Sequence, residues 1–422
     1  MTKTSREYAR ELDREDPLAA QRPHFVIDDP DLIYLDGNSM GRLPKAAIER
    51  VKTAVEEEWG RDLIRSWNAG WWDSPVRVGE KIARLIGAAR GQVLVSDQTS
   101  INLFKLATAA LNLRPGRTRI VTDTLNFPSD LYILQGIVEF LGDRHEIVHI
   151  GARNDDVTPD LAELEAVVDE TTALVCLSHV VFKSGYLYDM HAITEMAHRR
   201  GAFALWDLSH SVGAVPIELD RSGVDFAIGC TYKYLNGGPG APAFLYVNKV
   251  VQDEAVSPIW GWWGQRRPFE FGVDYNPAEG VSRFLTGTPP MLSLLAMETA
   301  LEPLLEVGVA RVHEKSMRLT QYAVDLSDAM LSAHGFTLGS PREPERRGSH
   351  VSLRHPDGYR VNRALIEEMK VIPDFRAPDN IRLGFAPLYV SFEDVWDAID
   401  RLQRVVTEKR FEKYPQQKLT VT

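Results

Sequence analysis

The sequence predicts an α/β fold with a mainly parallel central sheet, helices on both faces, and a smaller C-terminal α+β domain. Seven short apolar runs lie between residues 92 and 247 without clean alternation of apolar and polar residues, which is typical of strands buried on both faces. Most are separated by segments long enough for crossover helices, for example 100–112, 128–142 and 189–200. From Met291 onward, long helical patterns give way to short strands mixed with helices.

The predicted elements follow one another along the chain. Residues 33–44 are rich in Gly, Asn and Pro, which indicates a structured loop, and a helical pattern covers 44–59. An aromatic-rich loop follows over 66–75. The seven predicted strands are 92–95, 119–122, 146–150, 173–178, 202–206, 224–229 and 243–247. In the C-terminal part we expect one long helix or a pair of helices over 291–333, strands over 349–353 and 380–385, and helices over 360–369 and 392–407.

These patterns divide the chain into three parts. Residues 1–49 are expected to form an N-terminal segment that packs on the small domain, and residues 50–290 the large domain. Residues 291–422 are expected to form the connecting helix and the small C-terminal domain. A chain of 422 residues is long enough for two domains with a large core.

Composition narrows the function. The formal net charge of -11 argues against nucleic-acid binding, which needs an excess of Lys and Arg. The N-terminus lacks the apolar stretch of a signal peptide, and nowhere is there an apolar run long enough for a membrane span. Cys176 and Cys230 lie in apolar segments, as buried thiols do in a reducing compartment. We therefore expect a cytoplasmic protein, and no metal site is predicted.

An acidic residue and a lysine stand at the ends of two successive predicted strands. Asp207 ends the run 202–206, where ligands of open α/β sheets bind, although Asp is also a common helix cap. Lys233 follows the run 224–229 and precedes a glycine-rich loop, which is an unusual place for a solvated charge. Together they are what pyridoxal phosphate (PLP) requires: a carboxylate that keeps the pyridine nitrogen protonated, and a lysine that forms a Schiff base with the aldehyde.

Two predicted helices begin with residues that suit the rest of this cofactor. The segment 97–102 (DQTSIN) opens a helix with hydroxyls and free backbone N–H groups, which form an anion site suited to the phosphate. The segment 127–130 (FPSD) opens another, with an aromatic face and a second carboxylate. Plain helix capping explains either segment alone, whereas all four features at strand ends in this order favour PLP.

With these residues in view, the sequence resembles the kynureninases, a family of fold-type I PLP-dependent enzymes. The resemblance covers nearly the whole chain, and eight landmarks stand in order. They are YLDGNSMGRLP (34–44), IRSWN (64–68), TSINLFK (99–105), FPSD (127–130), DLSH (207–210), TYKYLN (231–236), GWWG (261–264) and IRLGFAPLY (381–389).

The resemblance implies roles for individual residues. Lys233, Tyr232 and Asp207 would be catalytic, with Tyr232 in proton transfer. Arg382 would bind the substrate carboxylate, as a planar guanidinium can. The implied cofactor-binding residues are Thr99, Ser100, Phe127, Pro128, Ser129, Asp130, Ser178, Asp207, His210, Tyr232, Lys233, Trp262 and Thr288.

The resemblance also implies an activity: the hydrolysis of L-kynurenine to anthranilate and L-alanine, in tryptophan catabolism and NAD biosynthesis. Trp67, Gly287 and Thr288 follow the bacterial pattern, which implies a preference for L-kynurenine over 3-hydroxykynurenine. Gln265 departs from the His found in many relatives. Trp262 and Thr288 would come from a second subunit, so a homodimer with shared active sites is the implied assembly.

Other functions fit the sequence less well. A cysteine desulfurase or selenocysteine lyase of the same fold usually needs a mobile cysteine in the C-terminal third, and this chain has none after Cys230. An aminotransferase lacks the pocket landmarks above. A non-catalytic PLP-fold binding module need not keep Lys233, Asp207 and Arg382 together. A dinucleotide-binding protein would show a G-x-G-x-x-G after the first strand, which is missing here.

Overall fold

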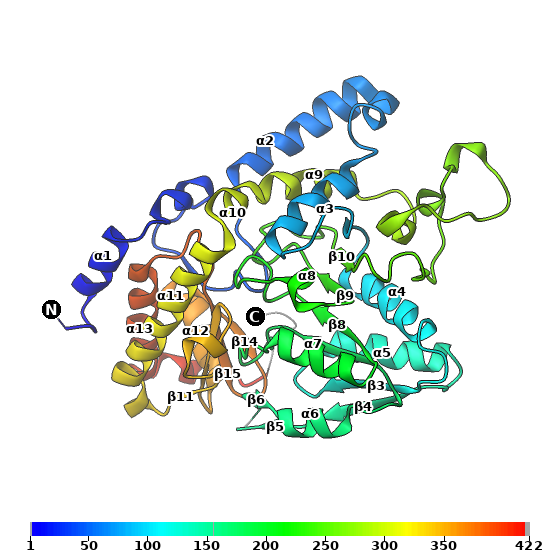
Figure 1. The fold of residues 1–422 in the computed structure, drawn as a ribbon. Helices are drawn as coiled ribbons and strands as arrows, with labels where there is room; N and C mark the ends of the chain where they lie inside the picture. The colour runs from blue at the N-terminus through cyan, green and yellow to red at the C-terminus, as the bar shows by residue number, and fades with distance from the viewer. Residues whose placement is uncertain (1, 155, 418–422) are drawn as a thin grey trace.

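The centre of the molecule is a seven-stranded, mainly parallel sheet. The computed structural model describes residues 2–154 and 156–417, and its large sheet has the order β2-β10-β9-β8-β7-β3-β4 (Figure 1). Only β10 runs against its neighbours within this sheet. The sequence prediction is confirmed for the fold class and for all seven strands. They are β2 (Val93–Val95), β3 (Arg119–Asp123), β4 (Glu146–Ile150), β7 (Thr172–Ser178), β8 (Phe203–Asp207), β9 (Phe226–Gly229) and β10 (Phe244–Val247).

Each face of this sheet has its own hydrophobic core, because successive side chains of a strand point to opposite faces. In β8, Leu205 belongs to the core under α4 (Thr99–Asn112) and α5 (Pro128–Phe140). The next residue, Trp206, belongs to the core on the other face, which α7 (Met190–Arg199) covers. Both faces are buried, which is why these strands read as unbroken apolar runs in the sequence.

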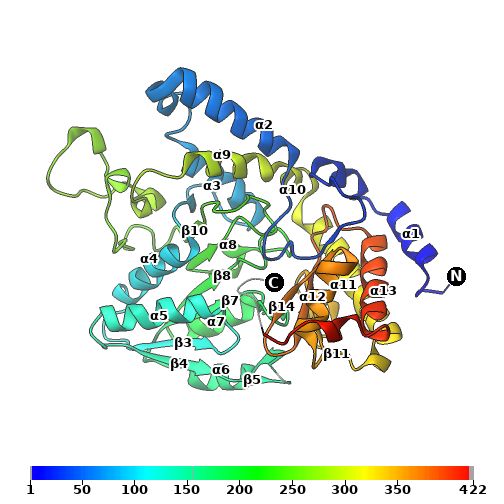
Figure 2. The same cartoon turned by 180° about the vertical axis from the view of Figure 1, so that it is seen from behind.

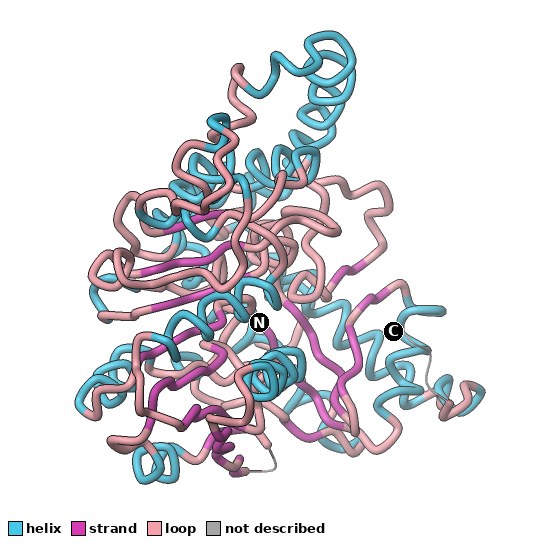
Figure 3. Tube along the Cα trace, turned by 90° about the vertical axis from the view of Figure 1, so that its right-hand side faces the viewer, coloured by secondary structure: helices cyan, strands magenta, loops and turns pink. Residues whose placement is uncertain are grey.

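The C-terminal part is built on a four-stranded antiparallel sheet beside the large one (Figures 2 and 3). β12 and β15 were expected, whereas β11 and β14 are too short to leave a pattern. The strands are β11 (Thr337–Leu338), β12 (His350–Arg354), β14 (Asp374–Arg376) and β15 (Asn380–Gly384). The helices around this sheet are α11 (Val309–Met330), α12 (Gly358–Met369) and α13 (Phe392–Thr407).

The connection between the two sheets differs from the prediction. Where we expected one long helix or a pair over 291–333, the chain forms three: α9 (Met291–Ala300), α10 (Glu302–Val307) and α11. Pro303 lies in the first turn of α10. Proline is tolerated there because the N–H groups of the first turn have no hydrogen-bond partner within the helix. Gly308 then separates α10 from α11 with a φ of 81°, a left-handed value that favours glycine.

The remaining elements are shorter or lie around the large sheet. α2 (Lys45–Thr53) packs along α9 and continues into a π-helical turn, Ala54–Asp62. α3 (Ser74–Leu85) packs on β2 at the edge of the large sheet. The others are α1 (Arg6–Arg14), α6 (Leu161–Val167), α8 (Leu219–Ser222), β1 (Ile33–Tyr34), β5 (Ala152–Arg153), β6 (Thr158–Pro159) and β13 (Val371–Ile372).

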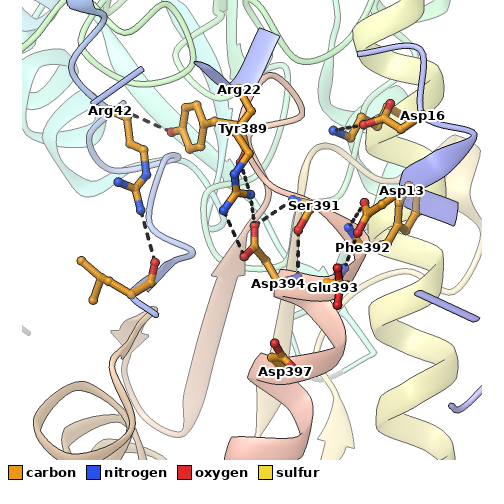
Figure 4. Close-up of polar contacts among 12 residues, drawn as sticks. Asp13, Asp16, Arg22, Arg42, Tyr389, Ser391, Phe392, Glu393, Asp394 and Asp397 are labelled. Atoms are coloured by element: carbon orange, nitrogen blue, oxygen red, sulfur yellow. Dashed lines mark hydrogen bonds and ion pairs between the residues drawn. The ribbon is translucent and has the colours of Figure 1, made fainter. Parts of the chain in front are cut away.

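The N-terminal segment is attached to the C-terminal part of the chain. α1 lies against α13, and β1 pairs in parallel with β13. The Asp13 carboxylate accepts hydrogen bonds from the backbone N–H groups of Phe392 (2.7 Å) and Glu393 (2.9 Å), which begin α13 (Figure 4). Arg22 forms an ion pair with Asp394 in the same turn. These contacts satisfy N–H groups that have no partner within the helix.

A buried ion pair fastens the same segment to α11. Lys315 Nζ lies 2.7 Å from Asp16 Oδ2, and the two side chains are only 5% and 3% exposed. Asp16 also accepts a hydrogen bond from the backbone N–H of Leu18 at 2.9 Å. A charge this deeply buried is tolerated only while its partner is present.

We predict that Asp16→Asn lowers the free energy of unfolding by about 3 kcal/mol, because it leaves the Lys315 ammonium buried without its counter-charge. Chemical denaturation measures this loss. Asp28→Asn, at an exposed carboxylate of the same segment, is the control and should leave stability unchanged. Equal stability of the two variants would contradict the assignment.

Candidate active site

The predicted site residues converge on one cavity at the carboxyl ends of the large sheet's strands. The cavity has a volume of about 230 Å³. Residues that follow β2, β3, β8 and β9 enter it from the large sheet, and residues of β14 and β15 enter it from the small one. It is lined by Asn38, Ser39, Thr99, Ser100, Phe127, Ser129, Asp130, Phe182, Asp207, Ser209, His210, Tyr232, Lys233, Arg376 and Arg382.

Two helix N-termini meet at one end of the cavity. α4 begins at Thr99 and α5 at Pro128, and neither start is capped by the side chain of the residue before it. The hydroxyls of Ser100 and Ser129 lie 3.0 Å apart, so the two helices open at the same point. Uncapped N–H groups, the positive ends of two helix dipoles and two hydroxyls make an anion site.

Two carboxyl groups are buried together further along the wall. Asp207 Oδ1, at the end of β8, accepts hydrogen bonds from the backbone N–H and the hydroxyl of Ser209, at 2.9 and 2.6 Å. Burial raises the pKa of Asp207, and burial together with the charge of Asp207 raises the pKa of Asp130 well above its usual range. Asp130 Oδ2 has no hydrogen-bond partner among the residues that the structure describes. This end of the cavity therefore suits a cationic group.

Lys233 faces these carboxyl groups across the cavity. Its Nζ lies 2.9 Å from His210 Nε2 and 5.9 Å from the centre of the Phe127 ring. Burial and the charge of Lys233 lower the pKa of His210 well below its usual value, so the imidazole is neutral and accepts a hydrogen bond from the lysine. The Lys233 side chain is only partly buried, which leaves its amine accessible from the cavity.

The wall of the cavity that the small sheet contributes is positively charged. Arg382 on β15 is 1% exposed and donates to both oxygens of Asp374, with Nε 2.9 Å from Oδ1. Its Nη2 also donates to Ser39 Oγ at 2.9 Å, and Nη1 to the Phe182 carbonyl at 2.5 Å. The small sheet thus delivers a fixed guanidinium to a cavity whose other walls belong to the large sheet.

A second carboxyl group, besides that of Asp374, lies close to this arginine. Burial, and then the charge of Asp374, raise the pKa of Asp36 to about 7. Its Oδ1 has no hydrogen-bond partner within the described residues. Asp36 belongs to the loop that also supplies Asn38 and Ser39 to the cavity.

The residues predicted from sequence fall into two groups. Thr99, Ser100, Phe127, Ser129, Asp130, Asp207, His210, Tyr232, Lys233 and Arg382 all line the cavity. Pro128 begins α5 beside it, and the Ser178 hydroxyl is buried behind it, where it donates to Asn126 Oδ1 at 2.6 Å. The roles of these residues stay predictions.

The other predicted residues are not part of this cavity's lining. Trp67 packs edge-on against Trp71 and Trp263, with ring centres 5.3 and 5.2 Å apart. Trp262 is 46% exposed, and Gly287 and Thr288 are exposed. Within one chain, therefore, the predicted aryl-binding residues and the cavity are separate.

Sequence reasoning missed several residues of the cavity wall. Asn38 and Ser39 belong to the loop predicted over 33–44, but neither type is specific enough to predict a ligand contact. Arg376 belongs to β14, a strand of three residues that pairs antiparallel with the strand of Arg382. Its place in the cavity wall follows from this pairing, which the sequence does not show. Phe182 follows β7 and Ser209 follows β8, so their position after a strand is the sequence feature that could have indicated a ligand contact.

The groups in this cavity fit PLP. The phosphate matches the uncapped helix starts at Thr99 and Pro128, and the aldehyde matches the Lys233 amine. A protonated pyridine nitrogen would bring a second positive charge, in addition to that of Lys233, to the buried Asp207 and Asp130. Buried polar atoms without partners, Asp130 Oδ2 and His210 Nδ1, are what a polar ligand would satisfy. The described residues hold no group of His, Cys, Asp and Glu suited to a metal ion.

The fold and this site together define the class of fold-type I PLP-dependent enzymes. A cysteine desulfurase from Thermococcus onnurineus NA1 superposes with a TM-score of 0.76 at 19% sequence identity, covering 94% of this chain and 98% of that one. A cysteine desulfurase from Escherichia coli gives a TM-score of 0.76 at 18% identity, covering 92% and 99%. At such identity the likeness establishes the fold alone.

Sequence similarity gives the particular family. The model of the kynureninase C-terminal domain matches residues 312–402, and that of the DegT/DnrJ/EryC1/StrS aminotransferase family matches residues 58–218. A kynureninase from Pseudomonas fluorescens is 45% identical over 411 residues, 96% of each chain. One from Burkholderia pseudomallei (strain 1106a) is 44% identical over 407 residues, 95% of each chain. The chain belongs to the kynureninase family.

We predict that Asp36→Asn removes a pH dependence of stability. Because the pKa of Asp36 is raised in the folded chain, its contribution to stability is fully present below about pH 4 and is lost as the pH rises through about 7. The melting temperature of the variant minus that of the wild type should therefore increase as the pH is raised from about 5 to about 8. Asp31→Asn, at an exposed carboxylate nearby, serves as control. A constant difference across this range would contradict the prediction.

Proposed function

We propose that the chain hydrolyses L-kynurenine to anthranilate and L-alanine with the help of PLP, by cleaving the bond between Cβ and Cγ. The observation that carries this proposal is the one cavity in which Lys233, the buried carboxylate of Asp207 and the guanidinium of Arg382 meet, in a chain of the kynureninase family. The substrate carries the complementary groups: an α-amine, an α-carboxylate and a carbonyl at Cγ.

Different residues of the cavity bind different parts of the cofactor. Thr99, Ser100 and Ser129 bind the phosphate with hydroxyl and backbone donors, and the Phe127 ring packs on the pyridine. Asp207 pairs with the ring nitrogen, with Asp130 beside it. Lys233 would hold the cofactor through its aldehyde. PLP, when bound, supplies an electron sink for the negative charge that develops on the substrate.

Proton transfer depends on residues around Lys233. The Lys233 amine, once released, accepts the proton from Cα of the substrate, and His210 at 2.9 Å holds that amine in place. The neighbouring Cys230 thiol and burial raise the pKa of Tyr232 above its usual value, so its hydroxyl stays protonated at neutral pH. Water then adds its hydroxyl to the γ-carbonyl carbon and the Cβ–Cγ bond breaks. Tyr232 donates a proton to Cβ and regains one from the water.

The assembly that we propose is a homodimer with shared active sites. Trp262 and Thr288 are exposed and outside the cavity of their own chain, so a second copy must supply them if they bind the cofactor. The segment before Thr288 is fixed to the start of α4, since Lys105 donates to the Phe284 carbonyl at 2.7 Å and also pairs with Asp97. It is therefore held in a defined position at the surface.

Exposed apolar side chains near Trp262 support the same assembly. Trp260, Phe269, Phe271 and Val273 are between 61% and 99% exposed. They belong to the segment 260–273, here called the excursion, which lies in the yellow-green stretch that extends from the body of the molecule in Figure 1. Apolar groups gathered at a surface in this way mark a protein interface. Trp67, Gly287 and Thr288 would then form the aryl pocket and favour L-kynurenine over 3-hydroxykynurenine.

The place of the protein in the cell is part of the proposal. We propose a cytoplasmic enzyme of tryptophan catabolism and NAD biosynthesis. Cys176 and Cys230 are both buried free thiols, which is compatible with a reducing compartment. Among the described helices none is long and apolar enough to cross a membrane.

We predict that the purified protein with PLP releases anthranilate from L-kynurenine, measured by anthranilate fluorescence, and that Lys233→Ala reduces kcat at least about 10³-fold. The lysine is both the cofactor anchor and the acceptor of the α-proton, so its loss removes two functions at once. The absorbance band of the Schiff base between PLP and Lys233 should disappear in the same variant.

Lys249→Ala, at an exposed lysine after β10, is the matched control and should keep full activity and absorbance. 3-Hydroxykynurenine and cysteine serve as comparison substrates, with slower turnover expected for the first and none for the second. A protein that binds PLP but turns over only cysteine would be a desulfurase, and the proposal would be wrong.

We predict that Phe271→Asp combined with Val273→Asp shifts the protein from dimer to monomer and reduces kcat together with PLP affinity. Two charges on the most exposed apolar positions of the excursion make burial between subunits costly. Analytical ultracentrifugation measures the mass. Val250→Asp, at an equally exposed apolar residue outside the excursion, should stay dimeric. A fully active monomer would contradict shared active sites.

A further inference from the structure

Two arginines of the small sheet share one carboxylate in the cavity wall. Arg382 on β15 and Asp374 on the antiparallel neighbour β14 stand directly opposite each other. Asp374 pairs with Arg382 through both of its oxygens and with Arg376 Nη2 at 2.6 Å. Both guanidiniums line the cavity. One carboxylate therefore serves two positive charges.

A second carboxyl group does not fully compensate this excess. Asp36 is the other acid close to the two arginines, and burial raises its pKa to about 7. Asp36 is therefore not fully ionised near neutral pH. The arginine end of the cavity thus keeps a net positive charge that an anionic group of a ligand can neutralise.

Arg382 alone has little left to offer such an anion. A guanidinium has five N–H donors in a fixed plane. Four are engaged: Nε and one of Nη2 with Asp374, the other of Nη2 with Ser39 Oγ, and one of Nη1 with the Phe182 carbonyl. A two-point contact with a further carboxylate would require Arg382 to release Asp374, which would leave that carboxylate buried without its main partner.

Arg376 has the donors that Arg382 lacks. Its Nε is buried without a hydrogen-bond partner in the part of the chain that the structure describes. Its side chain is 34% exposed, against 1% for Arg382, so the guanidinium is accessible from the cavity. Asp374 and, at 3.4 Å, Ser39 Oγ hold its Nη2 in place.

We propose that Arg376 is a second substrate-binding residue, which holds the α-carboxylate of the amino-acid substrate together with the remaining Nη1–H of Arg382. Asp374 fixes the two guanidiniums side by side, so that the pair, rather than Arg382 alone, recognises the carboxylate. This inference rests on the proposed function, because it takes an α-amino acid as the ligand.

The test compares two ligands that differ only in the carboxylate. L-Alanine and L-alaninamide are titrated calorimetrically into PLP-loaded wild type and Arg376→Gln. The Kd of L-alanine should rise roughly 10- to 100-fold in the variant, which is the effect of a lost hydrogen bond to a charged group. The Kd of L-alaninamide should not change. With L-kynurenine as substrate, KM should rise while kcat stays within about threefold.

A matched control separates binding from structure. Arg354→Gln removes an arginine of the same small sheet that pairs with Asp379 at 3.1 Å and does not line the cavity, and it should leave both Kd values unchanged. Arg376→Lys keeps the charge without the planar fork, so its Kd for L-alanine should lie between wild type and Arg376→Gln. If Arg376→Gln does not fold, the Kd values of Arg376→Lys for the two ligands are compared with those of the wild type instead.

Two results would overturn the inference: an unchanged Kd for L-alanine in the Arg376 variants, or an equal loss for both ligands, which would mean a structural role. Failure of the proposed function looks different. In that case L-kynurenine yields no anthranilate with the wild type, while the preference for L-alanine over L-alaninamide and its dependence on Arg376 can still be measured.

Discussion

The burial of Asp207 beside Asp130 is the constraint on which the site depends. Two carboxyl groups in one buried wall repel each other, and burial raises the pKa of both. Such an arrangement costs free energy unless a cation is bound there. The seven-stranded sheet and the helices on its two faces hold the pair in position, because Asp207 ends β8 and Asp130 lies in the first turn of α5. The fold thus maintains a place for a positively charged ring.

The rest of the cavity is arranged around this pair by charge. The anion-binding helix starts, the guanidiniums of the small sheet and Lys233 all line the same cavity. The arginine end depends on contacts that cross from the N-terminal segment, since Ser39 donates to Asp374 at 3.0 Å and accepts from Arg382. The Asp16–Lys315 pair fastens the same segment to α11. The substrate end of the site is therefore built from segments more than 300 residues apart in the chain.

Sequence patterns were sufficient for the large sheet and for most of the cavity. Strands buried on both faces leave continuous apolar runs, and strand-end position placed Asp207 and Lys233 at the same edge. The patterns failed where a contact depends on tertiary pairing. β14 is three residues long, so nothing in the sequence indicates that Arg376 stands beside Arg382. The division of 291–333 into three helices depends on Pro303 and Gly308. The prediction missed it because the segment as a whole has a helical pattern.

We propose that Lys233, and no other lysine, binds the cofactor. Reduction of the PLP-loaded protein with sodium borohydride, proteolysis and mass spectrometry test it directly. We expect a pyridoxyl group on the peptide that contains Lys233, and none on Lys105, whose amine is held by Asp97 and the Phe284 carbonyl. A pyridoxyl group on any other lysine, or on none, would contradict it.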